Sequence, residues 1–173
     1  MAESQSTNAT FVAPPPNPEL RRLERLVGDW EVHGTALESL AGPAGPVRSH
    51  ESFEWLDGGY FLVHRYETWF GDQPVQRGVM YWGFDDATRR FLLHFFSNNG
   101  PFTKDGNVYE GEIVGNQLIC TGPARFTIAL GEDGSVKLAN DHSFEVEWKL
   151  RDAGGLWRPW MRDTYRLHYS NSV

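Results

Sequence analysis

The residues best suited to do chemistry in this sequence are His142 and Asp163, because each interrupts a row of apolar residues. Over residues 136–150 the even-numbered positions are mainly apolar and include His142. Over residues 157–167 the odd-numbered positions are mainly apolar and include Asp163. Successive strand residues point to opposite faces, so both side chains are predicted to face the protein interior. A buried carboxylate needs a partner and imidazole titrates near neutral pH, so the two are predicted to form an acid–base pair.

The connection between these two segments leaves two registers open. A two-residue turn at 152–153 places Asp163 opposite His142, whereas a four-residue loop at 152–155 places it opposite Phe144 and diagonal to His142. In both registers the carboxylate is expected to orient the imidazole and raise its pKa, as a structural clamp or as part of an acid–base pair. The alternative is that His142 is an ordinary hydrogen-bonded core residue and that Asp163 clamps an arginine at the barrel rim.

His64 is a third candidate, and it belongs to a hairpin closed by two consecutive glycines. A two-residue turn there predicts that Phe53 lies opposite His64 and that Glu51 lies opposite Tyr66. His64 is therefore a candidate acid, base or hydrogen-bonding group facing the interior. A hydrogen-bonded core histidine is the alternative.

The inward-facing positions together predict a cavity for a ligand, with mainly apolar walls and a few directional polar groups. Its catalytic candidates are His64, His142 and Asp163. The orientation of His94 stays open, because both faces of its strand are apolar. The predicted ligand-binding residues are Glu51, Phe53, Trp55, Leu62, Tyr66, Phe126, Ile128, Asn140, Phe144 and Met161.

Short strands separated by Gly, Asp, Asn and Pro turn signals are predicted to position these residues. Their hairpin-length connections favour an all-β, antiparallel up-and-down barrel of about ten strands, because closure removes exposed sheet edges. A two-sheet sandwich is the alternative. The predicted strands are 28–37, 47–57, 60–70, 75–84, 90–97, 107–114, 117–122, 124–130, 136–150 and 156–169.

One short N-terminal helix is predicted over residues 18–27. Asn17 supplies an N-cap, a proline occupies the first helical position, and three leucines fall on one face. The helix is expected to close the barrel floor, with Trp30 filling the narrow end. Residues 1–17 are predicted to be a disordered tail, of which 1–16 are dispensable, and residues 18–173 to be a single lipocalin-like barrel domain.

Several motifs of the chain resemble a known family. They are Leu-x-x-Leu-Val-Gly-Asp-Trp at 23–30, the hairpin at 55–62, Tyr-Trp-Gly-Phe-Asp at 81–85 and Thr-Tyr-Arg at 164–166. In these residues the chain resembles a bacterial lipocalin-like domain family of unknown function within the calycin group and, more distantly, nitrobindin and fatty-acid-binding protein barrels. The resemblance implies a barrel with an internal cavity. A nitrobindin-like haem site would need an inward histidine near the C-terminus, and His168 follows the polar register of its strand.

The composition of the chain limits the classes of partner that it is expected to bind. The net charge is −7 at pH 7 and the basic residues are scattered, which disfavours nucleic acid. The sequence has no apolar run long enough for a signal peptide or membrane span, and it has a lone cysteine, Cys120. These features predict a cytoplasmic protein without membrane association and without an internal disulfide. No cofactor is expected, no metal-ligand spacing is present, and a homodimer is compatible with the sequence.

Three classes of function remain. The first is binding of a hydrophobic or aromatic small molecule in an internal barrel cavity. The alternative is an enzyme, a cyclase, isomerase or hydrolase acting on a hydrophobic natural product, with a cavity histidine as general acid or base. The third is a haem or metal protein.

Overall fold

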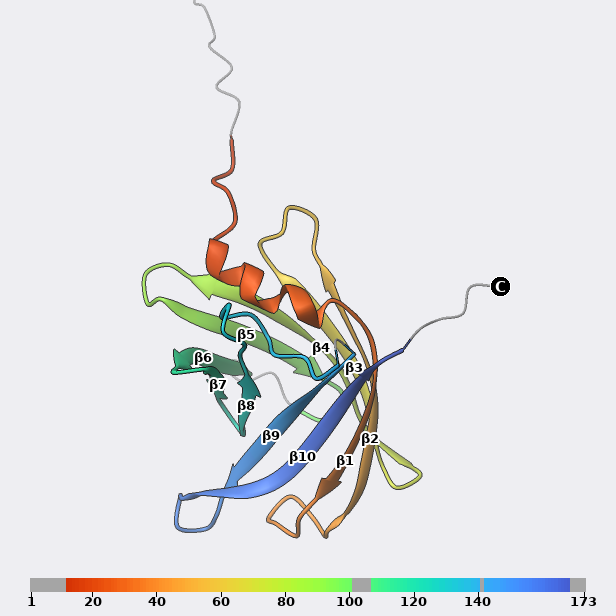
Figure 1. Cartoon of the computed structure of the whole chain (residues 1–173). Helices are drawn as coiled ribbons and strands as arrows, with labels where there is room; N and C mark the ends of the chain where they lie inside the picture. Colours follow the sequence, from red (N-terminus) through yellow and green to blue (C-terminus); the bar gives the residue numbers. More distant parts are fainter. Residues whose placement is uncertain (1–11, 101–106, 141, 169–173) are drawn as a thin grey trace, which may run out of the picture.

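The computed structural model describes residues 12–100, 107–140 and 142–168, which form a closed barrel of ten antiparallel strands and one helix (Figure 1). Each strand pairs with its neighbours in sequence, and β1 pairs with β10 to close the barrel. This confirms the predicted barrel and excludes the sandwich. The elements are η1 (Pro18–Leu26), β1 (Gly28–Ala36), β2 (Gly45–Trp55), β3 (Leu62–Phe70), β4 (Gln73–Asp85), β5 (Arg90–Ser97), β6 (Val108–Val114), β7 (Gln117–Thr121), β8 (Arg125–Ala129), β9 (Ser143–Arg151) and β10 (Trp157–Leu167).

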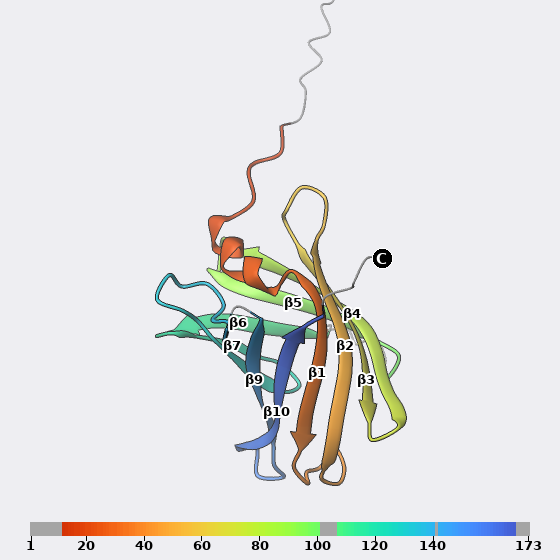
Figure 2. The ribbon, with the colours of Figure 1, turned by 45° about the vertical axis from the view of Figure 1, so that its right-hand side comes forward.

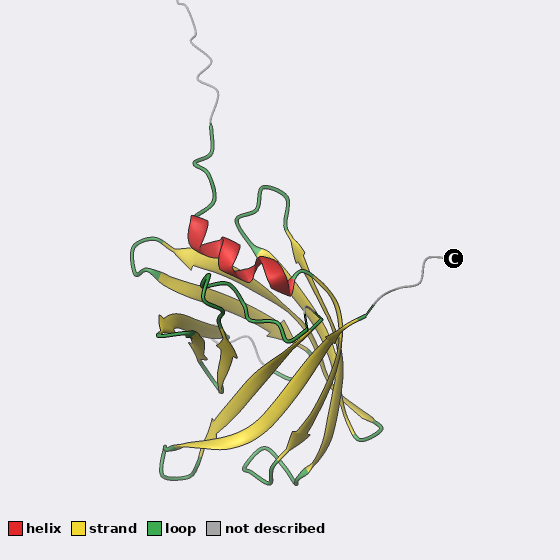
Figure 3. Cartoon of the chain, viewed as in Figure 1, coloured by secondary structure: helices red, strands yellow, loops and turns green. Residues whose placement is uncertain are grey.

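The helix η1 is a 3-10 helix that lies across one end of the barrel (Figure 3). The Asn17 side chain accepts a hydrogen bond from the backbone N–H of Glu19, as expected of an N-cap. Leu20, Leu23 and Leu26 are buried against the barrel. Trp30 is also buried, and its indole N–H donates to the carbonyl of Leu26 at 2.7 Å. The helix and the tryptophan therefore close this end as predicted.

The first hairpin has the predicted register. Phe53 lies opposite His64 and Glu51 opposite Tyr66 across β2 and β3. The long strands β1, β2, β3 and β10 run side by side along one wall of the barrel (Figure 2). The sequence predicts this register correctly because the turn is short and the predicted inward positions of the two strands lie opposite one another.

The predicted strand 136–150 is wrong in its first half, since β9 begins only at Ser143. Asn140 lies in the preceding turn with a φ of 52°, and both Asn140 and His142 are exposed rather than inward-facing. Leu130 and Val136 form an isolated antiparallel bridge, and the backbone N–H of Val136 donates to the carbonyl of Arg22 in η1. This part of the predicted strand therefore makes an isolated bridge and a contact with the helix instead of a continuous strand.

The predicted register of β9 and β10 is also wrong, because Asp163 lies opposite Val146 rather than His142 or Phe144. The connection is longer than either predicted loop, and the pairing shifts at a β-bulge between Pro159 and Met161. Proline has no N–H to donate to the ladder, so a bulge beside it is expected. The backbone N–H of Leu167 donates to the carbonyl of His142, so His142 lies four residues along β10 from Asp163.

The side chains inside the barrel form a packed core in the half next to η1. Aromatic rings interlock there: Trp30 packs edge-on against Phe144 at 4.9 Å between centroids, and Phe144 stacks on Tyr165 at 4.3 Å. Cys120 is fully buried in the same core, and burial raises the pKa of its thiol. Space for a cavity therefore remains only in the opposite half of the described barrel.

Candidate functional site

The interior cavity has a volume of about 590 Å³ and lies in the half of the barrel away from η1. Residues from the β1–β2 loop and from the adjoining ends of β3 and β4 line it, at the lower end of the barrel in Figure 1. Its size falls within the range of small-molecule pockets. The lining residues are Ala36, Ala41, Gly42, Pro43, Val47, Ser49, Glu51, His64, Tyr66, Thr68, Phe70, Val75, Gln76, Met80, Phe95, Asn99, Tyr109, Pro123, Ala124, Trp148, Leu150, Trp160, Met161, Asp163 and Tyr165.

Aromatic rings of the packed core form the floor of this cavity. Phe53, Trp82 and Phe126 do not line the cavity, but rings that do line it rest on them. His64 stacks on Phe53 with 4.0 Å between centroids, and Trp148 packs on Phe126 at 4.8 Å. The polar cavity residues are thus held against a rigid apolar floor.

Glu51 and His64 form a buried pair in the cavity wall. Oε2 of Glu51 lies 2.7 Å from Nε2 of His64, and each side chain is less than one-tenth exposed. The pair joins the neighbouring strands β2 and β3. An ionised Glu51 accepts the Nε2 proton, which leaves Nδ1 as the other polar atom of the ring. Nδ1 is buried and has no hydrogen-bond partner in the described part of the chain.

Asp163 is a second buried carboxylate of the cavity, and only 4% of it is exposed. It packs over Gly34, the residue opposite it on β1. A Cβ atom at position 34 would overlap Oδ1 of Asp163 and would lie 2.8 Å from the backbone oxygen of Arg162. Glycine at position 34 is therefore what gives the Asp163 side chain room to pack at this place.

The electrostatic surroundings of Asp163 favour its neutral form. Burial, followed by the negative charge of Glu51, raises its pKa to about 7. Trp148 partly opposes this rise, but neither its Nε1 nor Oδ1 of Asp163 has a partner at ordinary hydrogen-bond distance. Asp163 can therefore gain or lose a proton near neutral pH, which is unusual for an aspartate.

Three tyrosines of the cavity stay protonated at ordinary pH. Burial and the charge of Glu51 raise the pKa of Tyr66 to about 12, although a hydrogen bond with Ser97 opposes the rise. Burial, then Glu51, then Asp163, raises the pKa of Tyr165 well above its usual value. Burial likewise raises the pKa of Tyr109. Their hydroxyls are therefore neutral, and each interacts with a neighbouring group of the protein: Ser97 for Tyr66, the Ala124 backbone for Tyr109 and Glu51 for Tyr165.

The structure brings together only part of the predicted site. Glu51, His64, Tyr66, Met161 and Asp163 line the cavity as predicted. The other predicted residues lie elsewhere, since large apolar side chains near η1 pack with one another and do not leave space. Phe53, Leu62, Phe126, Ile128 and Phe144 belong to the packed core, Trp55 packs at its edge, and Asn140 and His142 are exposed.

The predicted His142–Asp163 pair is not formed, because β9 and β10 are shifted relative to the predicted registers. His94, whose orientation was open, is exposed on the outer face of β5. A catalytic role for His142 stays a prediction that its position no longer supports.

Sequence reasoning did not select several residues of the site. Trp148 and Tyr165 occupy inward positions of the predicted alternation, so the pattern could have indicated them. Ser49 also follows the inward register of β2, and its hydroxyl lies 2.9 Å from that of Thr68. Gly34 carried no such signal, because its role depends on the residue that pairs with it across β1 and β10.

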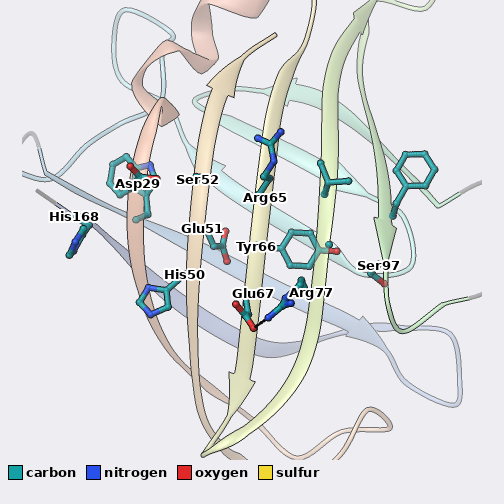
Figure 4. Close-up of a pocket in the computed structure, with 14 residues that line it drawn as sticks. Asp29, His50, Glu51, Ser52, Arg65, Tyr66, Glu67, Arg77, Ser97 and His168 are labelled. Carbon is teal, nitrogen blue, oxygen red and sulfur yellow. Dashed lines mark hydrogen bonds and ion pairs between the residues drawn. The ribbon is translucent and has the colours of Figure 1, made fainter. Parts of the chain in front are cut away.

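A second hollow, of about 790 Å³, lies along β1–β5 and is lined mainly by outward-facing residues. Figure 4 shows Glu51 and Tyr66, which also line the interior cavity, on the neighbouring strands β2 and β3. The Arg77 and Glu67 side chains form an ion pair there. Charges on this face are thus partly paired with one another.

A haem held by a C-terminal histidine does not fit this site. His168 lines the outer hollow, not the cavity, and its Nδ1 lies 3.5 Å from Glu31. Within residues 12–100, 107–140 and 142–168, no three His, Cys, Asp or Glu side chains are grouped to hold a metal ion.

Over the same described ranges, no helix is long and apolar enough to cross a membrane.

Comparison with known proteins identifies a fold and a family. The structure is similar to the crystal structure of Rv2717c from M. tuberculosis, with a TM-score of 0.62, 12% identity and coverage of 89% of this chain and 99% of that one. It also matches the S-type phycobiliprotein lyase CPES from Guillardia theta, with a TM-score of 0.49, 12% identity and coverage of 90% and 100%. No curated protein sequence matches. Residues 15–166 match the family described as "Protein of unknown function (DUF1579)", and the chain therefore belongs to that family.

Proposed function

We propose that this protein binds a hydrophobic small molecule in the interior cavity of its barrel. The observation that carries the proposal is the cavity of about 590 Å³, whose walls combine aromatic rings with a few buried polar groups. Apolar walls supply the affinity of such sites and sparse polar groups orient the ligand.

The unpaired polar atoms of the cavity residues support a ligand with directional contacts. Nδ1 of His64, Nε1 of Trp148 and Oδ1 of Asp163 are buried without a partner in the described part of the chain. Buried polar atoms without partners are few in folded proteins, because each is costly. A ligand, or waters that accompany it, would satisfy part of this set.

Binding can be tested with Nile red, a neutral apolar dye. We expect saturable binding with quenching of tryptophan fluorescence, because Trp148 and Trp160 line the cavity. Ala36→Phe should fill part of the space and weaken binding, whereas Ala129→Phe, at an exposed position of β8, should not. Absence of saturable binding to the wild-type protein would contradict the proposal.

An enzymatic function on a hydrophobic substrate is the second candidate, and one specific observation favours it. The same cavity holds the Glu51–His64 pair and an aspartate whose pKa is about 7. A carboxylate that fixes an imidazole, together with a group that titrates near neutral pH, is suited to general acid–base chemistry.

Hydrolysis of 4-nitrophenyl butyrate is a direct test of the hydrolase form of this candidate. If the cavity is catalytic, His64→Gln should lower kcat by about 10²-fold while Nile red binding persists. The control His94→Gln changes an exposed histidine on β5 and should leave the rate unchanged. A rate equal to that of the buffer would count against hydrolysis.

A further inference from the structure

We propose that the ligand of the interior cavity carries a cationic group, as in a hydrophobic or aromatic amine, and that Asp163 and Glu51 recognise that group. This inference rests on the proposed binding function and specifies the chemical class of the ligand. It follows from the charges that line the cavity rather than from its volume.

The described residues that line the cavity include two carboxylates, Glu51 and Asp163, but no lysine or arginine. His64 is the one titratable base among them, and Glu51 already binds it. When Asp163 is ionised, this wall is negative whether His64 is neutral or protonated. A ligand carboxylate would therefore add like charge without an arginine or lysine partner, whereas a cation would be attracted.

Asp163 is placed to accept a hydrogen bond from a cationic donor. The groups that face it from the elements packed around it are Glu51 of β2, Gly34 of β1, Trp148 of β9 and Tyr165 on its own strand. None of them is basic. The carboxylate is buried yet lacks an ion-pair partner within the described residues, an arrangement that an ammonium group of a ligand would complete.

The remaining walls also suit a cation bound through an aromatic skeleton. Seven aromatic side chains on five strands surround the space. The negative faces of such rings attract cations, more strongly when the site is shielded from water. These rings are Tyr66, Phe70, Phe95, Tyr109, Trp148, Trp160 and Tyr165.

Three probes of one skeleton separate charge from hydrophobicity: 1-naphthylmethylamine, 1-naphthylmethanol and 1-naphthoate, each competing with Nile red at pH 8. We expect the amine to bind about ten-fold more tightly than the alcohol, and the carboxylate to bind most weakly. Between pH 8 and pH 5.5 the amine should lose affinity as Asp163 takes up a proton, while the alcohol should not.

Single substitutions test whether Asp163 and Glu51 cause the preference for the amine. Asp163→Asn, and separately Glu51→Gln, should remove most of the preference for the amine over the alcohol. Circular dichroism checks that each variant remains folded. Glu110→Gln removes an equal charge from the exposed face of β6 and should retain the preference.

The outcomes separate this inference from the function on which it rests. If Nile red and the alcohol bind but the carboxylate competes as well as the amine, or if both variants retain the amine preference, the cationic ligand is refuted and the binding function stands. If none of the probes binds to the wild-type protein, both are refuted.

Discussion

The two halves of the barrel interior differ sharply, although one alternating pattern builds both. Next to η1, Trp30, Phe144 and Tyr165 interlock and fill the space. In the other half, the same strands present Ser49, Glu51 and Asp163, together with apolar and aromatic residues, around a cavity. Alternation decides only which side chains face inward. How these side chains pack against one another, and which of them are polar, decides whether the interior is a core or a binding site.

The largest expected effect is a loss of stability when a side chain is truncated in the packed half next to η1. Phe144→Ala should lower the free energy of unfolding by about 3–5 kcal/mol, because it removes a ring that contacts both Trp30 and Tyr165. Met161→Ala, at the cavity wall, should lower it by only about 1 kcal/mol, because that side chain already borders empty space. Urea unfolding monitored by circular dichroism measures both. Equal losses would show that the two halves are packed alike.

The next effect concerns the pH dependence of stability. In the folded protein Asp163 keeps its proton up to about pH 7, whereas an ordinary aspartate loses it near 3.8. Between these values the folded state binds more protons than the unfolded state, so Asp163 lowers stability as the pH rises from about 4 to 7. Asp163→Asn should therefore be more stable than the wild type by about 4 kcal/mol at pH 8.

Near pH 4 that advantage of Asp163→Asn should almost disappear, because Asp163 of the wild type is then neutral in the folded protein. Urea unfolding of both proteins at pH 4 and pH 8 measures whether the stability difference between them grows with pH. Glu110→Gln is the control for the removal of a charge. A wild-type protein that gains stability relative to Asp163→Asn as the pH rises would contradict the raised pKa.

A smaller effect is expected at Gly34, where the two strands of the cavity wall meet. Gly34→Ala should lower stability by about 1–3 kcal/mol, since the new Cβ overlaps the Asp163 side chain. Adding Asp163→Ala should relieve part of this loss, which a double-mutant cycle on thermal unfolding would measure. Gly100→Ala is the control, because a Cβ there would meet only ordinary contact. Purely additive effects would contradict the packing of Asp163 on Gly34.

The smallest expected effect is removal of residues 1–16. Residues 1–11 of the predicted tail lie outside the described residues, and residues 12–15 are exposed. Within residues 12–16, the Tyr60 hydroxyl donates a hydrogen bond to the carbonyl of Pro14. The truncated protein should melt within about 5 °C of the full chain, as measured by calorimetry. A larger drop that Tyr60→Phe reproduces would assign a stabilising role to this contact.

The sequence by itself determined the barrel, the closing helix and the inward face of the first hairpin. These features depend on local information: the N-cap at Asn17, the period-two alternation, and a short turn that sets Glu51 opposite Tyr66. The same alternation correctly placed His64 and Asp163 inside. Because parity along a strand is a local property, no tertiary contact was needed to infer it.

Only the tertiary structure decided which inward residues meet. The β9–β10 connection and the bulge beside Pro159 together set Asp163 opposite Val146, and β9 begins only at Ser143, so Asp163 and His142 do not meet. Asp163 and Glu51 influence each other from β10 and β2, which do not pair; β1 lies between them, and its Gly34 leaves room for the Asp163 side chain. Which residues meet across the barrel depends on how it closes and on the register of every strand pair between them. An error of one residue in a predicted loop or bulge therefore changes the predicted partners of all the residues that follow.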